Sequence, residues 1–193
     1  MNQETLWSVS RGTGLVALLL FTAAVILGAL NGSRAASPRW PRFVISALHR
    51  NVSLLALAFL VIHIATAVID PYAGIRWLDA LVPFGSAYRG RWLGLGAIAT
   101  DLVLAVVVTS LLRPRINARL WRVVHWCSYL SWPVAVLHGL GTAPDDTRIG
   151  WILGFNIACV LLVLIVVGWR MRVIHPDTAV RQAARAARQW GRP

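Results

Sequence analysis

Long apolar runs, separated by shorter polar segments, account for most of the chain. Each of five such runs extends over 17 residues or more, at 14–30, 43–69, 93–112, 123–140 and 150–169. An α-helix of about 20 apolar residues crosses the hydrocarbon core of a bilayer, and it satisfies its own backbone hydrogen bonds there. The pattern therefore predicts an all-α integral membrane bundle of five transmembrane helices.

The polar segments divide the chain into three predicted regions. They are a short extracytoplasmic leader at 1–13, a transmembrane domain at 14–172 and a basic tail at 173–193. The first run is alternatively a signal peptide, because the small residues GSRAAS follow it. In the tail, arginines recur at helical spacing. This spacing predicts an amphipathic helix on the anionic inner leaflet or, alternatively, a docking surface for a cytoplasmic reductase.

Composition and charge agree with a membrane protein. Hydrophobic residues make up 58% of the sequence and charged residues 13%, and the 19 basic residues are all Arg, against 7 acidic residues. Fourteen of these arginines lie in the first loop, the third loop and the tail, and five lie in the other polar segments. By the positive-inside rule, the N-terminus is extracytoplasmic and the C-terminus cytoplasmic. We therefore expect membrane lipid as a partner, no nucleic acid, and a place in the inner (plasma) membrane.

Four of the five histidines lie within two of the apolar runs. His49 and His63 are 14 residues apart, and His125 and His138 are 13 apart, which is about 20 Å along a helix. Ionisable side chains are costly in a bilayer and usually face the interior of a bundle. Imidazole is a common axial ligand of haem iron, so two such helices can hold two haems b, one above the other. Each histidine taken singly is equally well explained by a hydrogen bond to a neighbouring helix.

The charge pattern makes the two histidine-bearing helices parallel, both running from inside to outside. His49 and His125 then lie at the inner level, and His63 and His138 at the outer level. At about 100° per residue, a step of 14 residues returns nearly to the same helix face, whereas a step of 13 does not. We expect a kink or change of winding at Pro133, between the second two histidines, to bring His138 back toward its partner.

The histidine pairs and their spacings resemble the ferric reductase-like transmembrane domain. Ferric reductases, NADPH oxidases and the haem subunit of the bacterial periplasmic methionine sulfoxide reductase system share this domain. The resemblance covers roughly residues 12–172. It implies two haems b, with His49 and His125 on the inner iron and His63 and His138 on the outer iron. It also implies outward electron transfer to a ferric chelate, dioxygen or a redox protein.

The sequence departs from ferric reductases and NADPH oxidases in two respects. The family core often has six spans, and those proteins carry a flavin or nicotinamide domain on the same chain. No GxGxxG fingerprint occurs here, and the 21 residues beyond Arg172 are too few for such a domain. We therefore expect an oxidoreductase component with no flavin or NAD(P)H site, served by a separate flavoprotein or by quinol.

Three other functions are compatible with the same sequence. One is the haem subunit of a methionine sulfoxide reductase-like pair, which the resemblance includes. A second is a non-redox membrane protein whose histidines bind zinc or copper or simply join helices. The third is a haem sensor or carrier.

Four arginines are candidates for contacts with haem propionates, because a guanidinium group matches the geometry of a carboxylate. Arg50 and Arg122 lie beside, or one turn from, an inner histidine. Arg89 and Arg91 lie in the long outer loop, which we expect to cap the outer haem and to border an acceptor site. Anchoring at the membrane interface explains each arginine equally well. Asp101, inside the third run, has either a proton or cation role or a structural pairing.

Overall fold

The protein is helical throughout the residues that its computed structural model describes. These are 3–32, 41–142 and 150–190 for the backbone, and 4–31, 41–142 and 150–172 for the side chains. The elements are α1 (Gln3–Gly32), α2 (Arg42–Ile69), the 3-10 helix η1 (Trp77–Ala80), α3 (Gly90–Leu111), α4 (Ala118–Thr142) and α6 (Gly150–Trp190). No strand occurs in these ranges, so the prediction of an all-α fold is confirmed for them.

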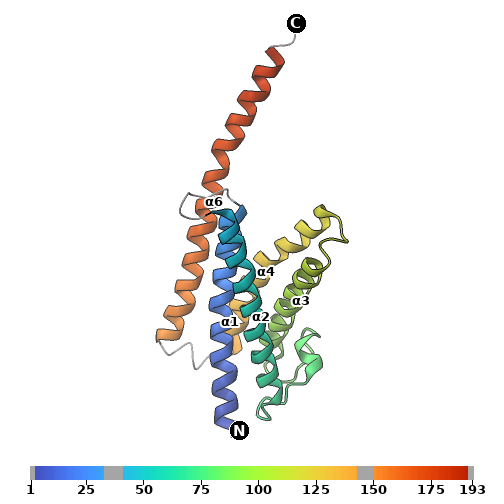
Figure 1. Cartoon of the computed structure of the whole chain (residues 1–193). Coiled ribbons are helices and arrows are strands. Elements are labelled where there is room, and N and C mark those ends of the chain that lie inside the picture. Colours follow the sequence, from blue (N-terminus) through green and yellow to red (C-terminus); the bar gives the residue numbers. More distant parts are fainter. Residues whose placement is uncertain (1–2, 33–40, 143–149, 191–193) are drawn as a thin grey trace.

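The helices form two antiparallel hairpins. α1 packs along α2, α3 packs along α4, and α1 also contacts α4 and α6. α1, α3 and α6 run in one direction, and α2 and α4 run in the other (Figure 1). The two helices that carry the histidine pairs are therefore parallel, as the sequence predicts.

Among the described residues, four helices are long and apolar enough to cross a membrane. They are the whole of α2, the whole of α3, the part of α1 at Glu4–Asn31 and the part of α6 at Gly150–Arg172. The chain is therefore a multi-pass membrane protein. At 25 residues α4 is long enough as well, but its histidine, serine and arginine side chains make it less apolar. Four of the five predicted spans are thus confirmed by length and composition, and the crossing by α4 stays a prediction.

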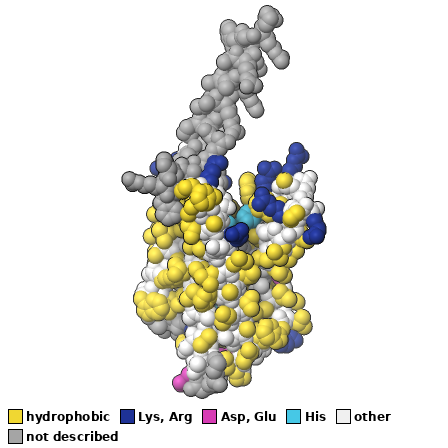
Figure 2. Space-filling model, in the orientation of Figure 1, with side chains coloured by type: hydrophobic (Ala, Val, Ile, Leu, Met, Phe, Trp, Pro, Cys, Tyr) yellow, Lys and Arg dark blue, Asp and Glu magenta, His cyan; other side chains and the backbone are white. Residues whose placement is uncertain are grey.

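Large apolar side chains cover the outside of the bundle (Figure 2). Leu54, Val61, Leu104 and Ile165 are exposed examples from four helices. The buried positions between helices are instead mostly small, and they include Ala17, Ala24, Ala29, Ala56, Ala97 and Ala99. Lipid tails are as apolar as leucine, so helices in a membrane associate through small residues that let their backbones approach closely. The distribution is the one that a bundle surrounded by lipid requires.

The two ends of the bundle differ in charge. Arginine side chains gather at the end where α2 and α4 begin (Figure 2). We call this the arginine-rich end, and its described arginines are Arg42, Arg50, Arg113, Arg115, Arg119, Arg122, Arg170 and Arg172. At the opposite end, residues 70–89 connect α2 to α3 and contain η1. We call this the loop end.

Polar contacts join α1, α4 and α6 at two depths. In the middle of the bundle, the buried indole Nε1 of Trp132 donates to the hydroxyl of Thr22 at 2.9 Å, and Thr22 donates in turn to its own helix. At the arginine-rich end, the guanidinium group of Arg170 donates to the hydroxyl of Tyr129 at 3.1 Å and to the carbonyl oxygen of Ala29 at 3.4 Å. These contacts hold α6 and the first hairpin against α4.

The two terminal regions are helical where they are described. Residues 3–13, assigned to a leader from the sequence, form the first part of α1. α6 continues for 41 residues as one helix, about 60 Å at helical rise, and extends beyond the other helices (Figure 1). The predicted basic face of the tail lies outside the residues whose side chains are described.

The contact between Trp132 and Thr22 predicts a measurable contribution to stability. Thr22→Val keeps the shape of the side chain but leaves the buried indole N–H without its acceptor. We expect a loss of about 1 kcal/mol in the free energy of unfolding, the range found for hydrogen bonds between membrane helices, measured by denaturant titration in mixed micelles. Thr66→Val is the control, because within the described part of the chain the hydroxyl of the half-buried Thr66 bonds only to carbonyls of its own helix. Equal losses in the two variants would contradict the assignment.

Candidate functional site

The four membrane histidines meet in two pairs between α2 and α4. The ring centroids of His49 and His125 lie 6.1 Å apart, and those of His63 and His138 lie 6.3 Å apart. The ring planes of the two pairs are inclined at 73° and 77°. The first pair lies toward the arginine-rich end and the second toward the loop end. The structure thus brings together the same partners that the sequence predicts.

Three of the four imidazoles are oriented by a hydrogen bond to a backbone carbonyl of a neighbouring helix. The Nδ1···O distances are 3.0, 2.8 and 2.9 Å for His49 with Ala24, His63 with Ser10 and His138 with Trp92. A carbonyl oxygen only accepts, so each Nδ1 carries the hydrogen and each Nε2 presents its lone pair. Metal-ligating histidines typically have this arrangement, which fixes the tautomer and raises the basicity of the ligand.

A glycine lies beside each of these three rings. Counted four residues on from the accepting carbonyl, the glycines are Gly28 for His49, Gly14 for His63 and Gly96 for His138. A Cβ atom at these positions would lie 3.3, 3.0 and 2.6 Å from the nearest imidazole atom. The missing side chain lets the ring approach the helix backbone closely. These glycines were not predicted, although Gly14 and Gly28 have the same 14-residue separation as His63 and His49.

α4 accommodates the 13-residue separation of its histidines. On an ideal helix this step would place His125 and His138 on different faces, yet both rings pair with histidines of α2. Pro133 lies inside α4 between them and removes one backbone hydrogen bond. The observed pairing agrees with the predicted return of His138 to its partner.

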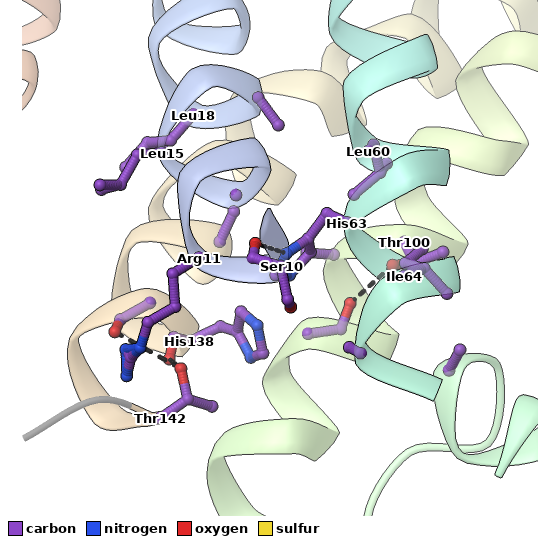
Figure 3. A pocket seen from close by; sticks show the side chains of 18 of the residues that line it. Ser10, Arg11, Leu15, Leu18, Leu60, His63, Ile64, Thr100, His138 and Thr142 are labelled. Carbon is purple, nitrogen blue, oxygen red and sulfur yellow. Dashed lines mark hydrogen bonds between the residues drawn. The ribbon is translucent and has the colours of Figure 1, made fainter. Parts of the chain in front are cut away.

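A cavity of about 660 Å³ contains the second histidine pair. Figure 3 shows His63 from α2 and His138 from α4 directed into it, with Ser10 and Thr100 nearby. Its walls come from all five α-helices and the loop at the loop end, and they are mainly apolar. Ligand pockets in proteins are typically about 300–1,000 Å³, so the cavity is large enough for a sizeable planar group. Of the described histidines, His63 and His138 border it, whereas His49 and His125 do not.

The loop at 70–89 contributes residues to the wall of the cavity at the loop end. Arg76 donates from Nη2 to Oδ1 of Asp79 at 2.9 Å and from its backbone N–H to Oδ2 at 3.0 Å. The side-chain hydrogen bond from Arg76 is the main reason that the pKa of the Asp79 carboxyl is lowered. Asp79, Tyr72 and Tyr88 also line the cavity, and the two tyrosine rings contact each other at 6.4 Å. The loop is therefore a folded segment beside this histidine pair, and its role as a cap over an outer haem stays a prediction.

The predicted arginine sites are only partly engaged by other protein groups. Nη1 of Arg89 donates to the carbonyl oxygens of Gly141 and Thr142 at 3.1 and 2.8 Å, so it binds the end of α4. Arg50, Arg91 and Arg122 are exposed. Contacts of these four side chains with haem propionates stay predictions.

Asp101 lies well inside α3 and is half-buried. It is eleven residues beyond the first residue of the helix, about 16 Å along its axis. Its predicted proton or structural role is not tested by this position.

Paired histidines inside a multi-pass helical bundle agree with the result of comparing the chain with protein families. The family model for the ferric reductase like transmembrane component matches residues 13–136. The chain belongs to this family. The matched region contains His49, His63 and His125 and ends two residues before His138. No curated protein and no solved structure matches the chain. Membership makes the protein a transmembrane redox component of a family whose members generally bind haem.

The glycine beside His138 predicts an effect on haem content in this ferric reductase-like protein. In Gly96→Ala, the new Cβ atom would lie 2.6 Å from the imidazole and must displace the ring from the Trp92 carbonyl. We expect the affinity for haem to fall about 10-fold, as is typical when a hydrogen bond that orients a ligand is removed. The measurement is the haem retained per chain after dilution. Gly154→Ala is the matched control, because nothing lies within 4 Å of a Cβ there. Unchanged retention in Gly96→Ala would contradict this role.

The loop predicts a dependence on pH. The pKa of Asp79 is lowered in the folded protein. The contribution of its carboxylate to the stability of the loop is therefore present above the unfolded-state pKa, and it is lost as the pH falls through the folded-state pKa. Asp79→Asn should reproduce the acid state at neutral pH and accelerate tryptic cleavage after Arg76. Cleavage after Arg115, at the arginine-rich end, is the internal reference. Equal acceleration at both sites would indicate general destabilisation instead.

Proposed function

We propose that this ferric reductase-like protein is a transmembrane di-haem b cytochrome. Electrons would pass from a cytoplasmic flavoprotein or a quinol donor to an extracytoplasmic acceptor. Haem b, when bound, supplies one-electron exchange between the ferric and ferrous states of its iron. The observation that carries the proposal is the meeting of four histidines, in two pairs at two depths, between two parallel helices.

The separation of the paired rings fits a metal ion between them. A metal–imidazole bond is about 2 Å long, and a ring centre lies about 1 Å behind its coordinating nitrogen. Two imidazoles on opposite sides of one ion therefore have centres about 6 Å apart, and the observed separations are 6.1 and 6.3 Å. His49 and His125 would hold the inner haem, and His63 and His138 the outer haem.

The number of nitrogen ligands favours haem over a bare metal ion. Structural zinc takes four protein ligands, whereas a haem iron already has four ligands from its macrocycle and needs only axial ones. In the described part of the chain, no group of three or more His, Cys, Asp or Glu side chains is placed to hold a metal ion. Each pair therefore suits a planar macrocycle better than a zinc or copper ion.

The protein's own groups prepare the outer site for such a ligand. Ser10 and Trp92 fix the tautomers of His63 and His138, so that both Nε2 atoms are available as ligands. The walls of the cavity are mainly apolar, and the hydrophobic surroundings of a metal site are one of the factors that set its potential. Gly14 and Gly96 leave room for the rings themselves.

The charge asymmetry supports an orientation in the inner (plasma) membrane. The arginine-rich end would be cytoplasmic by the positive-inside rule, which places the loop end outside. The five-span topology then has an extracytoplasmic N-terminus and a cytoplasmic C-terminus. The first histidine pair would lie nearer the donor, and the second nearer the acceptor.

The acceptor would approach beside the loop that lines part of the outer cavity. Tyr72, Asp79 and Tyr88 belong to this loop and line the cavity. A molecule held beside them would therefore lie next to the outer pair. A ferric chelate, dioxygen or a redox protein, such as the partner in a methionine sulfoxide reductase-like system, is compatible with this position. On the donor side, members of the family typically receive electrons from a separate flavin or NAD(P)H donor, which supports the same arrangement here.

Haem counting in single variants tests the proposal. Wild-type protein purified in detergent should give two haems b per chain by pyridine haemochrome assay, and His49→Ala and His63→Ala should each give one. His175→Ala, at the fifth histidine of the sequence, which lies in the basic tail, is the control and should retain two haems. Each loss should also remove a distinct component from the redox titration, since the two sites differ in their surroundings. No haem, or one haem indifferent to both changes, would contradict the pairing.

A further inference from the structure

One of the four histidines lacks the contact that orients the other three. Nδ1 of His125 is buried and, among the described residues, has no hydrogen-bond partner. The other three Nδ1 atoms donate to carbonyls of the adjacent antiparallel helix. The difference is confined to the pair at the arginine-rich end, where His49 alone has the carbonyl contact.

The register of the helices identifies the carbonyl that His125 would be expected to use. In the first hairpin, the 14-residue step from His63 to His49 on α2 corresponds to a 14-residue step from Ser10 to Ala24 on α1. In the second hairpin, His138 bonds to the carbonyl of Trp92 on α3. His125 lies 13 residues before His138, and the same step along antiparallel α3 leads from Trp92 to Ala105. A step of 14 residues would lead to the next carbonyl, that of Val106.

The hydroxyl of Thr109 lies within hydrogen-bond distance of both of these carbonyls. It donates to the oxygen of Ala105 at 2.7 Å and lies 3.2 Å from the oxygen of Val106. Thr109 is also four residues beyond Ala105, the position at which the other three sites have glycine. A hydroxyl on the acceptor does not by itself exclude an imidazole, because the carbonyl oxygen of Ser10 accepts from both the Thr13 hydroxyl at 3.0 Å and Nδ1 of His63 at 2.8 Å. The site of His125 differs in having the β-branched side chain of Thr109 at the position where the other three sites have a glycine.

His125 is held instead by an aromatic stack. The Trp121 ring lies one turn earlier on α4, with ring centroids 4.8 Å apart and planes at 23°. The guanidinium carbon of Arg113 lies 4.5 Å from the centre of the Trp121 ring, close enough for a cation–π contact. Arg113, Trp121 and His125 therefore form a continuous stack at the arginine-rich end.

We infer that Trp121 is the positioning residue for His125 and that Thr109 withholds from it the carbonyl contact that the other three histidines have. The inference rests on the proposed function, because it concerns His125 as an axial ligand. An Nδ1–H that donates to a carbonyl makes an imidazole a more basic ligand, and a more basic ligand favours ferric iron. The inner site, with one such donor, is thereby set to a higher potential than it would have with two.

Substitution of Thr109 in haem-loaded protein tests the first half of the inference. Thr109→Gly removes the side chain that stands at the glycine position of the other three sites, so His125 gains the acceptor that its counterparts have. We expect the midpoint potential of the inner haem to fall and its dissociation to slow by about 10-fold. Thr109→Ser retains the hydroxyl and the Cβ atom and is expected to match wild type. The outer haem of the same molecule is the internal control, and its unchanged potential and spectrum report that the bundle is intact.

Substitution of Trp121 tests the second half. Trp121→Leu removes the stack, and we expect the inner haem to dissociate about 10-fold faster, with a changed electron paramagnetic resonance signal as the plane of His125 reorients. Trp126→Leu is the matched control, because Trp126 lies on the same helix with 68% of its surface exposed.

Three results would overturn the inference. One is that the midpoint potential and the dissociation rate of the inner haem are unchanged in Thr109→Gly. Another is equal behaviour of Trp121→Leu and Trp126→Leu, and the third is an equal shift of both haems in either variant. Failure of the proposed function is distinguishable from these results, because wild-type protein would then lack the haem that His49→Ala removes.

Discussion

The hydrogen bond from an imidazole Nδ1 to a carbonyl of the neighbouring helix is the interaction on which the arrangement of this bundle depends. It places a polar ring in an apolar interior with its donor satisfied, and it leaves the lone pair of Nε2 available to a ligand. Because the bonded carbonyl belongs to a helix, the ring must lie almost against the backbone. A glycine four residues on makes that approach possible. Histidine, carbonyl and glycine thus form one unit, which occurs three times.

This unit explains why the bundle consists of two hairpins with parallel histidine-bearing helices. In each hairpin, the first helix supplies carbonyls and the second supplies imidazoles, and the pairs meet where the two hairpins face each other. Small residues at the helix contacts keep the backbones close. The large apolar side chains are left to face lipid. The same packing leaves a cavity around His63 and His138, and the loop between α2 and α3 lines part of it.

The two histidine pairs are therefore chemically unequal, although their ring separations are nearly the same. At the pair toward the loop end both imidazoles donate to carbonyls, whereas at the pair toward the arginine-rich end only His49 does and His125 stacks on Trp121. Hydrogen bonds and contacts to the ligands of a metal tune its affinity and potential. In a protein proposed to move electrons between two haems with identical axial ligands, these surroundings are a means of separating their potentials.

The sequence alone predicts the helical class and four of the membrane spans. It also predicts the parallel course of α2 and α4 and the partners in each histidine pair. Apolar length, charge asymmetry and the spacing of rare polar residues are properties of single segments, and a bilayer restricts them to few arrangements. Only the tertiary structure decided the roles of Gly14, Gly28, Gly96, Thr109 and Trp121. Each of these roles depends on which carbonyl of one helix lies opposite which imidazole of another. That register is set by packing between helices, and no single segment encodes it.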